Sequence, residues 1–180
     1  MTTYCETAPG HPFHGPYHDK EYGFPVTDES ILLERLSLEI FQAGLSWLIV
    51  LKKREGIKIA FKDFDVETVA AFTNNDVERL LKDTSIIRNR KKIEAIIYNA
   101  QQIIAIRDSH GGLATWIECH HPLAKEEWVK LFKKTFKFTG GEIVNEFLMS
   151  IGYLQGAHRS DCPIFEKITA IVPAWQKTQQ

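Results

Sequence analysis

Residues 38–54 read LEIFQAGLSWLIVLKKR, and this stretch decides how the chain folds. Before and within it, apolar residues recur at helical spacing behind a potential N-cap at Asp28, namely Ile31, Leu32, Leu36 and Ile40. Gly44 is typical of a residue that ends a helix, and Ser46 is a favourable cap for a second one. The stretch therefore predicts two helices joined by a tight glycine turn.

Glu39 and Trp47 are the residues of this stretch that suggest chemistry. Glu39 lies on the otherwise apolar final turns of the first predicted helix, and Trp47 opens the second. Burying a carboxylate is costly unless another group pairs with it. The simpler alternative places Glu39 on the surface, paired with Arg35 one helical turn earlier. The residues alone leave both interpretations open.

The composition is that of a folded globular protein without an overall nucleic-acid signature. The 180 residues are 44% hydrophobic and 25% charged, which suits one well-buried unit and argues against disorder. The formal net charge is −1 and the sequence pI is about 6.7. A DNA-binding function would therefore depend on local basic patches and backbone donors.

Cysteine content and hydropathy indicate a soluble cytoplasmic protein with reduced thiols. Three cysteines cannot form a complete set of disulfides. The first residues lack the basic region and apolar run of a signal peptide. No stretch approaches the roughly 18 apolar residues that a membrane span needs.

The order of patterns predicts an all-α fold in a single unit with three parts. Residues 1–26 are rich in Pro, Gly, His and Tyr and predict an irregular arm. Residues 27–154 predict a helical core, because one helical pattern follows another and no alternating strand pattern rivals them. Residues 155–180 form a C-terminal tail.

Residues 77–93 resemble a helix-hairpin-helix, with the hairpin near residues 84–92. The backbone N–H groups of such a turn and the positive end of the following helix can hold a phosphate. Arg88, Arg90, Lys91 and Lys92 would add a local basic patch. Ser85 falls where a left-handed residue is expected, a conformation that Ser tolerates poorly. The alternative is an ordinary helical hairpin with a solvated run of charges.

Two Cys and two His residues, from opposite ends of the chain, could form a metal site. Cys5, His18, His158 and Cys162 together make a complete structural Zn²⁺ ligand set. Their spacing is not that of a zinc finger, so spacing alone does not select them. A rival cluster is Cys119, His120 and His121, whose adjacent side chains would point in different directions on a helix.

Several ungapped blocks, in the same order, resemble the 3-methyladenine DNA glycosylase I family of the helix-hairpin-helix superfamily. These blocks are residues 17–23 (YHDKEYG), 38–54 and 86–93 (IIRNRKKI). The similarity extends over nearly the whole chain and is weakest between residues 113 and 134. The resemblance implies base-excision repair of double-stranded alkylated DNA, in which a 3-methyladenine nucleotide is flipped into a pocket and its N-glycosidic bond is hydrolysed.

The resemblance also assigns roles to individual residues. Tyr17 and Trp47 would flank the flipped base, with Tyr22 completing the aromatic set, and Glu39 would accept a hydrogen bond from its edge. For Tyr22, aromatic core packing is the alternative. Gly44 and Leu45 would probe the gap left in the duplex, or else make a simple hydrophobic cap contact.

DNA contact and metal binding are likewise carried over from the family. The hairpin would grip DNA through Ser85, Ile86, Arg88, Arg90 and Lys91. The Cys5, His18, His158 and Cys162 site would hold a structural Zn²⁺ that staples the two ends of the chain together. The enzyme would act as a monomer and would not cleave the strand, because no lysine stands in the pocket motif to form a Schiff base. No catalytic Asp is found beyond the hairpin, and Glu142 is assigned no role.

Three departures from the family pattern keep other functions open. Family members commonly carry an aromatic residue where this chain has Glu6 and Thr7, and they favour Trp at the position of Tyr22. With Ser85, these departures would suit a non-catalytic or altered-specificity DNA-binding member of the same fold. A zinc hydrolase is a further rival, but a closed Cys₂His₂ set leaves no open metal position.

Overall fold

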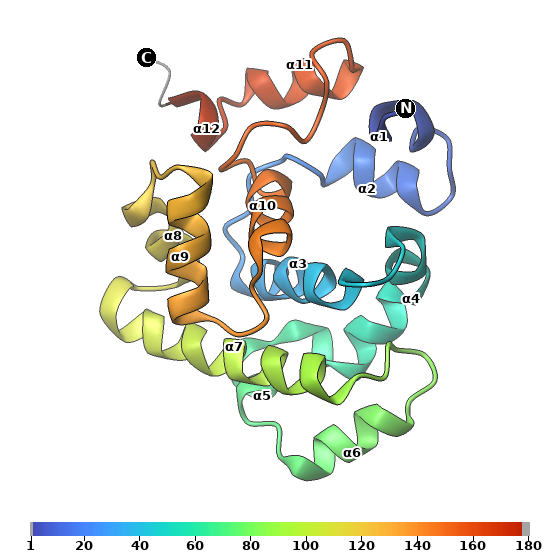
Figure 1. The fold of residues 1–180 in the computed structure, drawn as a ribbon, viewed down its shortest axis with the longest axis vertical. Coiled ribbons are helices and arrows are strands. Elements are labelled where there is room, and N and C mark those ends of the chain that lie inside the picture. Colours follow the sequence, from blue (N-terminus) through green and yellow to red (C-terminus); the bar gives the residue numbers. More distant parts are fainter. Residues whose placement is uncertain (1, 178–180) are drawn as a thin grey trace.

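The computed structural model describes residues 2–177, and every regular element in that range is helical (Figure 1). This confirms the predicted all-α class. The elements are α1 (Tyr4–Thr7), α2 (His14–Lys20), α3 (Glu29–Gln42), α4 (Trp47–Ala60), the 3-10 turn η1 (Lys62–Phe64), α5 (Val66–Ala70), α6 (Asn74–Lys82), α7 (Arg90–His110), α8 (Leu113–His120), α9 (Lys125–Thr135), α10 (Gly141–Ser150), α11 (Pro163–Ala170) and α12 (Ala174–Lys177). Within residues 2–177, no helix combines the length and the apolar character needed to cross a membrane.

The two helices of the opening stretch begin and end where their local chemistry predicts. The Asp28 carboxylate accepts a hydrogen bond from the backbone N–H of Ile31 at 3.0 Å, which caps α3. The Ser46 hydroxyl oxygen accepts one from the N–H of Ile49 at 3.4 Å, which caps α4. Between them Gly44 has a φ of +81°, a left-handed conformation that glycine adopts without strain. The helix–glycine turn–helix prediction is confirmed.

Helix α3 is the centre of the fold. All residues from 32 to 41 are buried, and α4, α7, α8 and α10 pack around the helix (Figure 1). Leu32, Leu36 and Phe41 are fully buried, and burial of each such side chain contributes about 1.5–3 kcal/mol. A helix buried on every face can place a polar side chain inside the protein only where a cavity or a partner receives it.

The predicted irregular arm is partly helical. Helices α1 and α2 lie within it, and Pro16 occupies the first turn of α2, where a missing N–H costs no hydrogen bond. The Pro- and Gly-rich composition of this segment predicted irregular structure, but Pro16 is compatible with a helix because it lies in the first turn. The first helices, α1 and α2, lie on the same side of the molecule as the last ones, α11 and α12 (Figure 1).

The hairpin between α6 and α7 is present, but its geometry corrects one expectation. None of residues 83–89 has a positive φ, so Ser85 is not in the left-handed conformation expected for it. Instead, the N–H and hydroxyl of Ser85 donate to one Asp83 carboxylate oxygen, at 2.8 and 2.6 Å. This side-chain turn reverses the chain without a left-handed residue.

The hairpin loop is held closely against α4. A Cβ added at Gly56 would lie 2.8 Å from Ser85 atoms, including its backbone oxygen. The Lys53 ammonium group also donates to the carbonyl oxygen of Thr84 at 2.8 Å. The hairpin thus has a fixed position relative to the helix that Trp47 begins.

Candidate active site and metal site

A cavity of about 960 Å³ opens among the N-terminal helices, the α3–α4 turn and α10. Its walls are more apolar than polar, and three carboxylates (Glu39, Glu142 and Glu146) and four aromatic side chains line it. The principal lining residues are Tyr4, His14, Tyr17, Tyr22, Glu39, Trp47 and Glu146, with Gly44 and Leu45 among the residues of the α3–α4 turn.

Glu39 lies at this cavity and is not a surface residue. It is 5% exposed, and its carboxylate makes no ion pair or hydrogen bond with any residue in the range 2–177. Burial, followed by the nearby Glu146 carboxylate, raises the pKa of Glu39 to about 8, while Arg35 opposes the shift. An acid in this state gains most from a ligand that brings a positive charge or a hydrogen-bond donor.

Arg35 is not the partner of Glu39, because another carboxylate engages it. Arg35 donates to Glu21 at 3.0 Å. Arg54 binds the same Glu21 through two hydrogen bonds of 2.8 Å and reaches Glu34 at 2.8 Å. This network joins the end of α2 to α3 and α4 and excludes the surface-pair alternative for Glu39.

The predicted aromatic residues gather at one wall of the cavity. The rings of Tyr17 and Tyr22 are stacked, with centroids 5.6 Å apart, and Trp47 meets Tyr17 edge-on at 5.1 Å. Tyr17 is 3% exposed, and its buried hydroxyl has no hydrogen-bond partner among the described residues. Burial raises the pKa of both tyrosines, so both rings carry neutral hydroxyls.

Sequence reasoning did not identify Tyr4, His14 and Glu146 as cavity residues. Tyr4 packs edge-on against Tyr22 at 5.8 Å and hydrogen-bonds His14 through its hydroxyl at 3.2 Å. Tyr4 thus supplies an aromatic wall near the position where Glu6 and Thr7 replace the expected aromatic residue. Glu146 comes from α10 and accepts a hydrogen bond from the Tyr22 hydroxyl at 2.9 Å. Only the clustering of aromatic residues near Cys5 offered a signal for Tyr4, and none marked Glu146.

The glycine turn forms the rim of the cavity. Gly44 and Leu45 are exposed, and Leu45 is 39% exposed although it is a large apolar side chain. Both line the cavity. A hydrophobic cap contact would bury Leu45 more fully, so its exposure favours a contact outside the chain.

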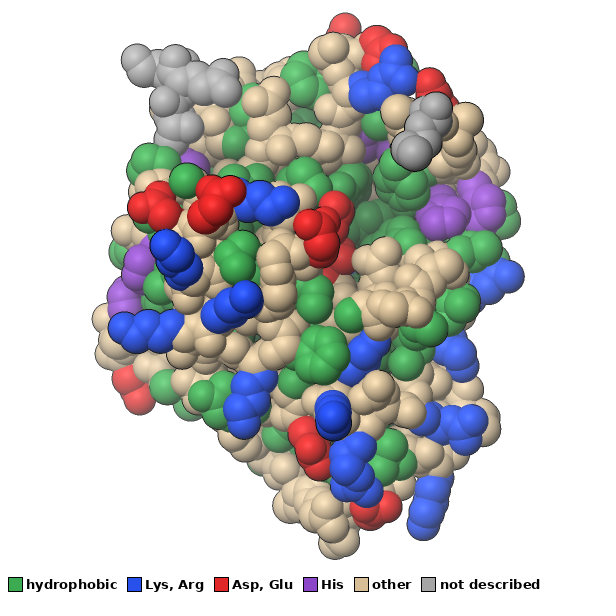
Figure 2. Space-filling view, viewed as in Figure 1, with side chains coloured by type: hydrophobic (Ala, Val, Ile, Leu, Met, Phe, Trp, Pro, Cys, Tyr) green, Lys and Arg blue, Asp and Glu red, His purple; other side chains and the backbone are tan. Residues whose placement is uncertain are grey.

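The residues predicted for DNA contact differ in solvent exposure and in whether they already form ion pairs. Arg88 and Lys91 are exposed, and basic side chains gather over the α4, α6 and α7 end of the molecule (Figure 2). Arg90 pairs with Glu78 and, at 3.6 Å, with Glu94. Ile86 is buried, so it can offer only its backbone. Arg88 and Lys91 are therefore the two free cations of the hairpin.

Lys92 does not belong to the basic patch in which sequence reasoning placed it. It is 5% exposed, and its ammonium group donates to the carbonyl oxygens of Phe41 and Ala43 at 2.8 and 2.6 Å. Burial lowers the pKa of Lys92. The helical pattern of α7 turns this residue inward, where it caps the end of α3.

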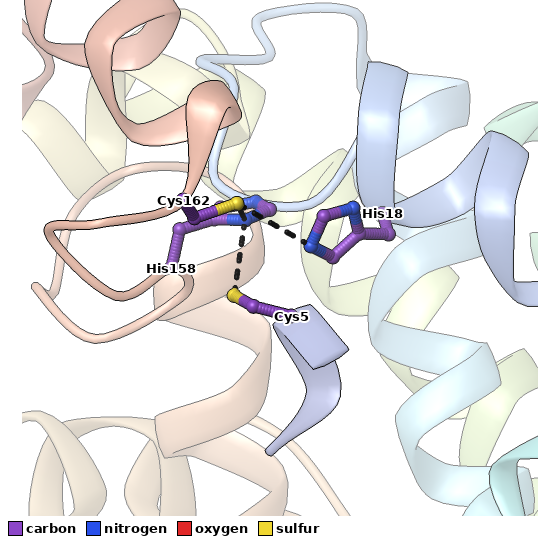
Figure 3. A group of neighbouring side chains, drawn as sticks. All are labelled: Cys5, His18, His158 and Cys162. Carbon is purple, nitrogen blue, oxygen red and sulfur yellow. Dashed lines mark hydrogen bonds between the residues drawn. The ribbon is translucent and has the colours of Figure 1, made fainter. Parts of the chain in front are cut away.

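The four predicted metal ligands meet in space (Figure 3). Cys5 comes from α1, His18 from α2, and His158 and Cys162 from the segment between α10 and α11. Their ligand atoms all lie within 4.8 Å of one another. Cys162 Sγ lies 3.6 Å from His158 Nδ1 and 3.8 Å from His18 Nε2, and Cys5 Sγ lies 3.7 Å from His158 Nδ1. Tetrahedral zinc holds S and N ligands roughly 3.5–3.8 Å apart.

Both histidines are oriented by a second hydrogen bond, as in metal sites. His18 presents Nε2 to the cluster while its Nδ1–H donates to Asp19 at 2.7 Å. His158 presents Nδ1 while its Nε2–H donates to the carbonyl oxygen of Tyr22 at 2.8 Å. The cluster can therefore bind a metal ion that links the N- and C-terminal segments.

The rival cluster does not assemble in the described part of the chain. Cys119 is exposed. His120 Nδ1 and His121 Nε2 instead bond the carbonyl oxygens of Trp116 and Ala174, at 2.7 and 3.0 Å. These three residues have structural or surface roles.

Comparison with known proteins connects this architecture to one family. The family model described as "Methyladenine glycosylase" matches residues 7–129. DNA-3-methyladenine glycosylase from Haemophilus influenzae is 34% identical, over 91% of this chain and 98% of that protein. DNA-3-methyladenine glycosylase 1 from Escherichia coli is 37% identical, over 82% of this chain and 89% of that protein.

Solved structures agree with the sequence comparison. The 3-methyladenine DNA glycosylase I structure from Staphylococcus aureus, described as explaining 3-methyladenine recognition, superposes with a TM-score of 0.79 at 33% identity, covering 89% of this chain and 95% of that chain. A Tyr-to-Phe variant of 3-methyladenine DNA glycosylase I in complex with 3-methyladenine gives a TM-score of 0.80 at 32% identity, covering 91% and 97%. With its all-helical fold, its aromatic and acidic cavity and its Cys₂His₂ cluster, this chain belongs to the methyladenine glycosylase family.

Proposed function

We propose that this protein is a monofunctional DNA N-glycosylase that releases 3-methyladenine from double-stranded alkylated DNA, acting as a monomer in the cytoplasm. One observation carries the proposal: the carboxylate of Glu39 is buried without a partner beside the rings of Tyr17, Tyr22 and Trp47. An unpaired buried carboxylate is costly in the empty protein, and a cationic base flipped into the cavity would offset that cost.

Capture of the base relies on stacking and on charge. Tyr17 and Trp47 flank the flipped base, and Tyr22 extends the aromatic wall. Stacking on an aromatic side chain is worth about 1–3 kcal/mol per base, which offsets much of the cost of leaving the duplex. Glu39 accepts a hydrogen bond from the base edge and favours a cationic base over neutral adenine, more strongly because the site is dry.

Bond cleavage needs only modest help from the protein. Methylation at N3 makes the base cationic, which weakens its glycosidic bond and makes it a good leaving group. The described residues that line the cavity include no lysine, and the nearby Lys92 is occupied by two carbonyl oxygens. A Schiff-base intermediate is therefore not expected, and neither is strand cleavage.

Duplex binding is assigned to the hairpin and to the rim of the cavity. Arg88 and Lys91, with the backbone of Ser85 and Ile86 and the N-terminus of α7, hold phosphates without reading sequence. Arg90 contributes less because Glu78 engages it. Gly44 and Leu45 fill the gap left by the flipped nucleotide, with Leu45 as an apolar wedge.

The metal is proposed to be Zn²⁺, held by Cys5, His18, His158 and Cys162. Two thiolates and two imidazoles make a donor set that suits zinc, and four protein ligands leave no open position for catalysis. When bound, the ion supplies folding energy by tying the N-terminal helices to the C-terminal segment. The cavity shares its tyrosine wall with this region, because His158 bonds the backbone of Tyr22.

Base release from alkylated duplex DNA, with the products identified, tests the proposed function. The expected product is free 3-methyladenine and an intact strand carrying an abasic site. A chain that binds the duplex and releases no base would instead be a non-catalytic member of the fold. Strand cleavage by the purified protein would contradict the monofunctional assignment.

A further inference from the structure

A second, partly buried carboxylate lines the cavity from a different helix than Glu39. Glu146 belongs to α10, whereas Glu39 belongs to α3. The third carboxylate of the lining, Glu142, is exposed and pairs with Lys125. The Tyr22 hydroxyl donates to Glu146 Oε2 at 2.9 Å. Tyr22 is itself 8% exposed and is fixed by its stack on Tyr17. Glu146 is thus held in position by a residue of the aromatic wall.

Among residues 2–177, no cation pairs with Glu39 or Glu146; Arg159 also lines the cavity but pairs with Glu6 and Asp161. The positive charge of Arg35 lowers the pKa of Glu39, but the Arg35 guanidinium group is paired with Glu21. Around Glu146 the charged neighbours are Glu142 and Lys125 of the adjoining segment, and Lys125 pairs with Glu142 at 3.8 Å. Burial raises the pKa of Glu146, and Glu146 in turn raises the pKa of Glu39. A charge on Glu146 therefore disfavours a charge on Glu39.

This arrangement suits a ligand that is cationic before reaction and neutral afterwards. In an N-alkylated purine nucleotide the ring carries the positive charge. When the bond from the sugar carbon to the base nitrogen breaks, its electron pair goes to the base, which leaves as a neutral molecule. The sugar carbon takes the positive charge until water adds and loses a proton. Two carboxylates stabilise the charged species along this path and have no charge to pair with in the released base.

We propose that Glu146, held by the Tyr22 hydroxyl, is a second substrate-recognising carboxylate that acts with Glu39 to select a positively charged purine nucleotide. This inference rests on the proposed function and adds a specificity-determining pair to it. It also gives a reason for Tyr at position 22, because a Trp ring carries no hydroxyl to hold the acid.

The test compares Glu146→Gln with Glu126→Gln. The control removes an equal charge from an exposed side chain of α9 that does not line the cavity. Two quantities are measured for each protein: the single-turnover rate of 3-methyladenine release from alkylated duplex, and the dissociation constant of free, neutral 3-methyladenine. Glu146→Gln is expected to slow release by about tenfold or more, as for loss of a hydrogen bond to a charged group. Its affinity for the neutral base should be unchanged or higher, and Glu126→Gln should resemble the wild type.

A second variant separates recognition from folding. Tyr22→Phe keeps the ring and removes the hydrogen bond, so it should slow release by a smaller factor with the same retained affinity for the neutral base. Parallel loss of release and neutral-base binding in Glu146→Gln would indicate a purely structural role and overturn the inference. Release by Glu146→Gln at the rate of the Glu126→Gln control would also overturn it and leave the proposed function intact. A wild-type protein that releases no base would overturn both.

Discussion

The ammonium nitrogen of Lys92 lies 2.6 Å from the carbonyl oxygen of Ala43, a residue 49 positions earlier in the chain. Lys92 is in the first turn of α7, which follows the hairpin, and Ala43 begins the turn that carries Gly44 and Leu45. The buried side chain of Lys92 thus connects the helix that follows the α6–α7 hairpin to the α3–α4 turn at the rim of the cavity.

Lys92→Met should therefore destabilise the protein and misplace the rim. The variant keeps the apolar stem but removes the donor from the buried carbonyl oxygen of Phe41 and the partly buried one of Ala43, which costs about 1–3 kcal/mol. Chemical denaturation measures this loss. Lys91→Met is the matched control, because the neighbouring side chain is exposed and its change should stay within about 0.5 kcal/mol. Equal stability of the two variants would show that the Lys92 contacts contribute nothing.

The hairpin prediction is tested by the salt dependence of DNA binding. Each phosphate contact that is lost should reduce the slope of log K against log salt by about 0.9, so Arg88→Ala combined with Lys91→Ala should reduce it by nearly two. Affinity should fall by similar factors for damaged and undamaged duplexes, because phosphates carry no base identity. Lys167→Ala, on α11 at the opposite end of the molecule, is the control (Figure 1). An unchanged slope in the double variant would remove the hairpin from the DNA interface.

The metal site is tested by analysis of bound zinc. Cys5→Ser removes one ligand that joins the N-terminal helices to the C-terminal segment, so zinc should fall below one equivalent and the melting temperature should drop. Cys119→Ser should keep the full equivalent, because that thiol is exposed and outside the cluster. The reverse pattern would assign the metal to the other cysteine.

These results also indicate which features are readable from sequence. The caps at Asp28 and Ser46 are hydrogen bonds from the backbone N–H three residues later in the chain. Such short-range contacts can be predicted from the local sequence pattern. The Ser85 expectation failed because the Asp83 side chain makes the turn in another way. In the sequence, Lys92 is indistinguishable from the exposed basic residues beside it. Only the packing of α7 determines that the Lys92 side chain points into the protein.

The acidic pair shows a different limit. Glu39 stands out in the sequence because a carboxylate on an apolar helix is unusual, although the residues alone leave its role open. Glu146 lies on a helix with other polar residues and meets the cavity only through the tertiary fold. The hydrogen bond that fixes it spans 124 positions in the sequence. No spacing rule connects such residues, and the same holds for Tyr4.

The raised pKa of Glu39 gives a prediction about stability and pH. Its carboxyl keeps its proton to about pH 8 in the folded protein, but loses it near the ordinary Glu value of about 4.3 when unfolded. Between these values the folded state binds more protons, so this residue lowers the free energy of unfolding as pH rises, by at most about 1.4 kcal/mol per pH unit. Glu146 and Arg35 are the charged groups that face it.

Glu39→Gln removes this titration. The difference in unfolding free energy between the variant and the wild type should therefore grow in favour of the variant from about pH 5 to 8. Urea denaturation at several pH values measures it. A difference that is constant with pH would mean that Glu39 is solvated in the folded protein.

The most direct test of the whole account is the single-turnover release of 3-methyladenine by Glu39→Gln, measured beside its stability. The variant keeps the size of the side chain and one hydrogen-bonding oxygen, but loses the charge that recognises a cationic base. We expect the wild type to release 3-methyladenine, and the variant to release it at least about tenfold more slowly while being as stable or more stable. Full release activity together with a small loss of stability would contradict the account, because it would place Glu39 in an ordinary structural role.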